Sequence, residues 1–185
     1  HLLDAVGRST LSTIPMHHEQ GAAIAAYAYG RTINSTGVCF ATSGPGATNT
    51  VTAVAAAFTD SVPMLFISGQ VSTLFSQRAH GLRQRGFQEF NITDMVRSST
   101  KYTVYVDKAA DIRYELEKAC YLARAGRPGP VWLDIPLDVQ AASIELESLR
   151  GFDPVAEGLA DLNPAPSPEL VASILEKLRT AKRPL

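Results

Sequence analysis

Cysteine is scarce in this chain of 185 residues, which contains only Cys39 and Cys120. Two cysteines cannot form the dense disulfide framework of a small secreted domain, and the sequence shows no four-ligand zinc spacing. Cys39 lies in an apolar run and Cys120 on an apolar helical stripe. We therefore expect two buried free thiols in a reducing compartment, and a cytoplasmic protein.

An excess of charge of either sign is also missing, because 17 Lys and Arg balance 18 Asp and Glu. The chain therefore lacks the global basic field that holds nucleic acid or an anionic membrane. It contains no run of about 18 apolar residues, so no transmembrane helix is predicted. The apolar fraction of 45% is typical of a globular domain with a sizeable core. We expect neither nucleic acid nor a membrane as a partner.

Apolar periodicity alternates between strand and helix along the first 140 residues. Buried strands are predicted at 37–42, 64–68 and 131–135, and weaker strands at 11–16 and 102–106. Helices are predicted around 2–6, 19–33, 51–58, 91–97 and 112–123, with a long loop at 69–86. Strands that alternate with helices predict an α/β fold, in which a mostly parallel sheet has helices on both faces.

The composition changes after Gln140. Residues 141–167 are rich in proline and acidic side chains, as in a linker. Ser167 and Pro168 then supply an N-cap and a first-turn proline for a helix with one apolar face. We divide the chain into a domain at 1–140, a linker at 141–167, and the truncated start of another domain at 168–185.

A glycine-containing segment, Thr42 to Asn49, joins a predicted strand to a predicted helix. Glycines there let the backbone approach a ligand, and a helix N-terminus favours anions. The segment is neither a dinucleotide fingerprint nor a P-loop. Three interpretations remain open: a tight turn, a ligand-binding loop, and a hydrolase nucleophile at Ser43, although Ala41 and Pro45 replace both glycines of that motif.

A second strand-to-helix junction carries His17, His18 and Glu19. Taken alone, an acidic residue at this place is explained by the helix dipole. The adjacent histidines point to different sides of the chain, so they do not predict a shared metal ion.

Four basic residues crowd the long loop: Arg78, His80, Arg83 and Arg85. They form either a solvated charged loop or a lid that meets an anionic substrate or phosphate. We expect residues 72–85 to be mobile until an outside anion pairs with them.

Six motifs together carry a family resemblance. In chain order they are His18-Glu19-Gln20-Gly21-Ala22, Ala41-Thr42-Ser43-Gly44-Pro45-Gly46-Ala47-Thr48-Asn49, Asp60-Ser61-Val62-Pro63, Ser68-Gly69-Gln70-Val71, Gly86-Phe87-Gln88-Glu89, and Gly126-Arg127-Pro128-Gly129-Pro130-Val131 with Asp134-Ile135-Pro136-Leu137-Asp138-Val139-Gln140. From about Leu2 to Gln140 the chain resembles the N-terminal, pyrimidine-binding domain of thiamine diphosphate-dependent enzymes, acetolactate synthases in particular. The family's first strand is missing from the chain.

This resemblance implies an enzyme that decarboxylates a 2-oxo acid such as pyruvate and ligates the carbanion to an acceptor carbonyl. It implies thiamine diphosphate at the interface of a homodimer or tetramer, with Mg²⁺ ligands outside this chain, and FAD in some members. The fragment alone would be inactive. Two alternatives stay open: another decarboxylase or carboligase with a larger acidic substrate, and a non-catalytic binding module of the same fold.

The resemblance also implies roles for individual residues. Glu19 matches the glutamate that hydrogen-bonds N1′ of the cofactor's aminopyrimidine and favours its imino tautomer, which takes the proton from the thiazolium C2. Thr42 and Gly44 match cofactor-binding positions. Gln88 matches a catalytic glutamine facing the substrate, and Phe87 lines the same channel. Arg127 matches an arginine that touches FAD, and it is also suited to holding the turn before the last strand.

Overall fold

The computed structural model describes residues 1–162 and 164–183, which divide into two compact units, His1–Asp153 and Pro154–Leu185. A parallel sheet of four strands organises the first unit, in the order β1-β2-β4-β3. The strands are β1 (Gly37–Ala41), β2 (Met64–Gln70), β3 (Tyr102–Tyr105) and β4 (Pro130–Pro136). All three pairings are parallel, with Phe66 of β2 opposite Trp132 of β4.

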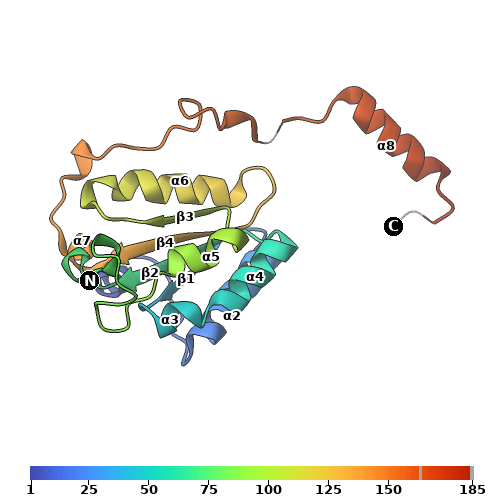
Figure 1. The fold of residues 1–185 in the computed structure, drawn as a ribbon. Helices are drawn as coiled ribbons and strands as arrows, with labels where there is room; N and C mark the ends of the chain where they lie inside the picture. The colour runs from blue at the N-terminus through green and yellow to red at the C-terminus, as the bar shows by residue number, and fades with distance from the viewer. Residues whose placement is uncertain (163, 184–185) are drawn as a thin grey trace. The chain divides into compact units, whose positions relative to one another are not determined.

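Helices cover both faces of this sheet (Figure 1). On one face lie α2 (Glu19–Ile33), α3 (Pro45–Thr48), α4 (Val51–Asp60) and α5 (Ile92–Val96). On the other face α6 (Ile112–Arg124) packs against β2, β3 and β4. The short helices α1 (Leu2–Arg8) and α7 (Leu137–Ala141) complete this unit. This arrangement confirms the α/β fold predicted from the alternating periodicity.

Side-chain alternation along β2 explains why its sequence is apolar without interruption. Met64 and Phe66 face the core beneath α2 and α4, whereas Leu65 and Ile67 face the core beneath α6. The rings of Phe66 and Trp132 stack with centroids 5.1 Å apart. A strand buried on both faces needs apolar residues at every position, as found here.

Two sequence predictions are wrong. Residues 11–16 form no strand, and Leu11 and Ile14 are 66% and 79% exposed. Pro15 removes a backbone donor from this segment, and no neighbouring strand supports it. Cys39 is buried as expected, but Cys120 is exposed, because the buried line of α6 runs through Ala119 and Ala123 and leaves Cys120 beside it.

Residues after α7 continue on the first unit before the second begins. Leu149 is buried, and the ring of Phe152 lies 5.8 Å from that of Tyr114 and 5.5 Å from that of Tyr121. The second unit contains α8 (Pro168–Thr180), whose N-cap Ser167 accepts a hydrogen bond of 3.2 Å from the Leu170 N–H. The predicted cap is therefore confirmed, whereas the linker bounds 141–167 stay a prediction.

Candidate functional site

Three segments meet near the carboxyl end of β1: the start of α2, the loop from Thr42 to α3, and residues 87–90. Gly44 has φ of +56°, and Gln88 has φ of +55°. A Cβ atom on Gly44 would lie 2.0 Å from the backbone oxygen of Gln88. Only glycine permits this approach, which joins the loop from Thr42 to Asn49 to the segment that carries Phe87 and Gln88.

Glu19 is the first residue of α2. The preceding His18 caps the helix, because its Nδ1 accepts a 3.2 Å hydrogen bond from the Gln20 N–H. The Glu19 Oε2 atom accepts a 3.1 Å hydrogen bond from the side chain of Asn49. The sequence thus places a carboxylate at a helix N-terminus and ties it to the neighbouring loop.

Electrostatics keep this carboxylate ionised. The pKa of Glu19 is lowered chiefly by its own backbone N–H and by the Asn49 amide; burial raises it, and His18 lowers it slightly further. Glu19 is therefore a hydrogen-bond acceptor in this state.

Gly46 brings the loop backbone close to Glu19. A Cβ atom there would lie 2.5 Å from the Thr42 Cγ2 atom and 3.3 Å from the Glu19 Oε1 atom. Any side chain at position 46 would therefore clash with Thr42 and press against the Glu19 carboxylate. The backbone at Gly46 therefore lies directly beside the side chains of Thr42 and Glu19.

Phe87 is 85% exposed and Gln88 is also exposed. The next residue, Glu89, is buried, and the sequence analysis gave it no role. Glu89 accepts hydrogen bonds from the backbone N–H groups of Gln77 at 2.5 Å and of Arg85 and Gly86 at 3.0 Å each. Ser76 Oγ donates a further bond of 3.0 Å to it.

These donors outweigh the effect of burial on Glu89. Burial alone raises its pKa, but the backbone donors and Ser76 bring the pKa below its usual value. The sequence offered one signal for this role of Glu89, because Glu89 is the single acidic residue directly after the basic loop.

Asp134 forms a second buried polar group near the carboxyl ends of β2 and β4. Ser68 Oγ donates to its Oδ1 at 2.6 Å, and Gln70 Nε2 donates to its Oδ2 at 3.0 Å. Trp132 Nε1 donates to the Ser68 hydroxyl at 2.8 Å, and Gln70 Nε2 also reaches the Phe90 carbonyl at 2.9 Å. Burial raises the pKa of Asp134 to about 6. This network connects the core to the segment that bears Gln88.

Arg127 lies apart from the other candidates. It precedes β4, so it is at the amino edge of the sheet, whereas Thr42 and Gly44 follow β1 at the carboxyl edge. Its Nε atom donates to Ser61 Oγ at 2.6 Å, and its Nη2 atom donates to the Thr59 carbonyl at 3.4 Å. In this chain Arg127 braces the end of α4.

The basic loop contains turns and hydrogen bonds that the sequence did not predict. Two short 3₁₀ turns, Thr73–Phe75 and Gln77–Ala79, interrupt the predicted irregular stretch. Arg85 Nη1 donates to the Leu74 carbonyl at 2.8 Å. Its mobility stays a prediction, but Glu89 supplies the negative charge that the loop itself lacks.

Among residues 1–162 and 164–183, no group of three or more His, Cys, Asp or Glu side chains could hold a metal ion. No helix within those ranges has the length and apolar character needed to cross a membrane.

Replacing Gly44 by alanine tests the contact with Gln88. The positive φ costs about 1–2 kcal/mol for a residue with a Cβ atom, and the clash with the Gln88 carbonyl adds to this. Gly81→Ala is a matched control, because Gly81 has φ of +62° with nothing within 4 Å of its Cβ position. We expect Gly44→Ala to lower the free energy of unfolding, measured with urea, more than Gly81→Ala does. Equal losses would contradict the contact.

Comparison with known proteins shows the family to which the chain is similar. Residues 1–95 match the family model described as "Thiamine pyrophosphate enzyme, N-terminal TPP binding domain". Acetolactate synthase 1, chloroplastic, of Zea mays is 42% identical over 173 residues, covering 91% of this chain and 25% of that protein. The acetolactate synthase isozyme 2 large subunit of Escherichia coli (strain K12) is 42% identical over 144 residues, covering 78% of this chain and 25% of that protein.

A third relative is the acetolactate synthase isozyme 1 large subunit of the same strain. It is 39% identical over 183 residues, which are 98% of this chain and 31% of that protein. The chain thus spans only about a quarter to a third of the length of these curated relatives. With half of its residues matched by the family model, the chain belongs to the thiamine pyrophosphate enzyme family, through that family's N-terminal TPP binding domain.

Proposed function

We propose that this chain is the pyrimidine-binding part of a thiamine diphosphate-dependent, acetolactate synthase-like enzyme. The enzyme would decarboxylate a 2-oxo acid, pyruvate first among them, and join the product to an acceptor carbonyl. The observation that carries this proposal is the ionised Glu19 at the start of α2, beside Gly46 and held by Asn49. The similarity to acetolactate synthases supports the same reaction class.

Bound thiamine diphosphate supplies a carbon nucleophile that stabilises the charge left by decarboxylation. Once protonated, Glu19 would donate a hydrogen bond to the unprotonated N1′ of the aminopyrimidine and pass its proton to that atom as the imino tautomer forms; its partly exposed side chain is accessible to the ring. Closure of the site by the rest of the enzyme would remove water and raise the pKa of Glu19 from its present lowered state, which strengthens the shared hydrogen bond. Thr42 and Gly44 would position the ring through the loop backbone.

The remaining parts of the site would come from elsewhere in the enzyme. Mg²⁺ and the diphosphate need ligands outside this chain, and the isolated chain would be inactive. We propose a homodimer or tetramer, in which another subunit would supply the diphosphate-binding side of the cofactor site. FAD, if present, would meet Arg127 only after that side chain leaves Ser61 and Thr59.

Phe87 and Gln88 would face the substrate, since both are exposed at the edge where Gly44 and Glu19 lie. One observation favours a second candidate function. The loop between Gln70 and Phe87 carries three arginines and a histidine, which suits a donor that is larger and more acidic than pyruvate.

An assay of the full-length protein with pyruvate, thiamine diphosphate and Mg²⁺ tests the proposal. Formation of acetolactate is the expected result. Release of acetaldehyde without ligation would indicate a decarboxylase. Turnover of a dicarboxylic 2-oxo acid, but not of pyruvate, would favour the second candidate, and no turnover with any 2-oxo acid would contradict both.

A further inference from the structure

A cavity of about 500 Å³ lies beside β3, the strand at the opposite end of the sheet from β1. Apart from Arg78, which the second candidate function counts among the arginines of the loop, none of its lining residues has a part in the proposed function. The 3₁₀ turns, α5 and β3 contribute most of its wall. The lining residues are Thr73, Ser76, Arg78, Thr93, Arg97, Thr103, Val104, Tyr105 and Asp107.

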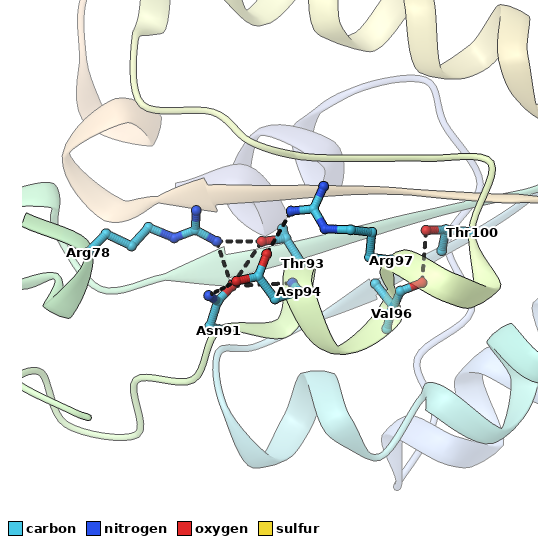
Figure 2. Close-up of polar contacts among 7 residues, drawn as sticks. All are labelled: Arg78, Asn91, Thr93, Asp94, Val96, Arg97 and Thr100. Atoms are coloured by element: carbon cyan, nitrogen blue, oxygen red, sulfur yellow. Dashed lines mark hydrogen bonds and ion pairs between the residues drawn. The ribbon is translucent and has the colours of Figure 1, made fainter. Parts of the chain in front are cut away.

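Two guanidinium groups reach toward each other over Thr93, as Figure 2 shows. Arg78 comes from the basic loop, and its Nη2 atom donates to Asn91 Oδ1 at 2.6 Å and to Thr93 Oγ1. The Arg78 guanidinium also lies over the Tyr105 ring, 4.4 Å from its centroid. These contacts fix the plane of the guanidinium at the cavity wall.

The charges of these two arginines are compensated differently. Arg97 donates to Asp94 at 2.6 Å, so its charge is neutralised locally. Arg78 forms no ion pair with any residue in the described ranges, although from a greater distance its charge helps to lower the pKa of Asp94 and offsets part of the rise in the pKa of Asp134. Its Nε and Nη1 atoms have no hydrogen-bond partner in those ranges. An arginine has five N–H donors in a planar fork, and that fork matches a carboxylate or a phosphate.

A hydroxyl group in the wall also lacks a partner. Tyr102 and Val104 pack on the α6 side of the sheet, so the alternation of the strand turns Thr103 to the opposite side. The Thr103 Oγ1 atom is shielded from solvent and has no hydrogen-bond partner among residues 1–162 and 164–183. Buried hydroxyl groups are normally satisfied by protein, water or a ligand.

We propose that this cavity binds a compact oxyanion, a small carboxylate or a phosphate, with Arg78 as the charged donor and Thr103 among the hydroxyl groups around it. Asp107 also lines the cavity, so a single compact anionic group fits better than a polyanion. The sequence predicts that the basic loop pairs with an outside anion, and in this proposal Arg78 binds that anion in the cavity. The proposal does not depend on the thiamine diphosphate chemistry.

Thermal unfolding of the full-length protein at pH 7 tests this site. Sodium phosphate, sodium acetate and sodium chloride are compared at equal ionic strength. We expect phosphate, acetate or both to raise the midpoint above its value in chloride, and the two arms show which oxyanion is preferred. Equal midpoints in all three salts would overturn the proposal.

Two arginine variants test whether the oxyanion binds at this cavity. Arg78→Gln should weaken the apparent Kd for the preferred oxyanion at least tenfold. Arg83→Gln, on the same loop but outside the cavity lining, should stay within twofold of the wild type. Equal weakening by both variants would show a general charge effect and overturn the site.

Thr103→Val keeps the test decisive if Arg78→Gln does not fold. Valine has the shape of threonine without the unpartnered hydroxyl, so we expect an unchanged or higher midpoint in chloride and a several-fold weaker response to the oxyanion. An unchanged response in this variant would overturn the proposal.

Discussion

Replacing Glu19 by glutamine in the full-length enzyme is expected to reduce turnover by about 10²–10⁴-fold, the usual contribution of a positioned acid or base. Glutamine keeps the size of the side chain and its place at the start of α2. It also keeps an oxygen that can accept from Asn49, which now donates to Glu19 at 3.1 Å. What glutamine cannot do is exchange a proton with N1′ of an aminopyrimidine. Steady-state kinetics with saturating cofactor measure the effect.

The control for this variant is Glu145→Gln, which removes one exposed carboxylate far along the chain from α2. We expect its turnover to match the wild type and both variants to unfold at the wild-type temperature. If Glu19→Gln retained turnover within about threefold of the wild type, the barrier would have changed by less than 1 kcal/mol. The proposed role of Glu19 would then be wrong.

The buried Asp134 predicts a pH dependence of stability. Its pKa rises from an ordinary 3.8 to about 6 in the folded chain, chiefly through burial. Between these values the folded state keeps a proton that the unfolded state has lost, so stability falls as the pH rises from about 4 to about 6. A shift of this size corresponds to about 3 kcal/mol.

Asp134→Asn removes this titration. The difference in unfolding free energy between the wild type and this variant should therefore shift by about 3 kcal/mol in favour of the variant as the pH rises from about 4 to about 7. Urea unfolding of the chain, followed by the fluorescence of its single tryptophan, Trp132, measures the difference. Asp107→Asn, at an exposed position, serves as the control. A difference that does not change with pH would show that Asp134 titrates normally.

The central strands were predictable because their physical requirements are strict. β2 and β4 are buried on both faces, so their sequences are apolar almost throughout, and α2 begins at the expected Glu19. Residues 11–16 are apolar enough for a strand, but pairing with a neighbouring strand, not composition, decides whether one forms. The exposure of Cys120 depends on which narrow line of α6 faces the sheet, which periodicity alone does not resolve.

The candidate site was predictable only in part. The glycine loop follows from the order of strands and helices, because it joins β1 to α3 at one edge of a parallel sheet. No strand precedes Glu19 in the structure, so its role was predictable only through the family resemblance. The approach of Gly44 to Gln88 was not predictable, because two positive φ angles in segments more than 40 residues apart must coincide. The same edge rule places Arg127 at the other end of the sheet, where it holds Ser61.

The carboxylate of Glu89 closes the basic loop on itself. It takes one backbone donor from the start of the loop, Gln77, and two from its end, Arg85 and Gly86. A loop held at one point by several donors cannot loosen one residue at a time, because release of one donor weakens the hold on the others. We therefore expect the backbone at Gln77, Arg85 and Gly86 to open together, so that the two ends of the basic loop move as one unit.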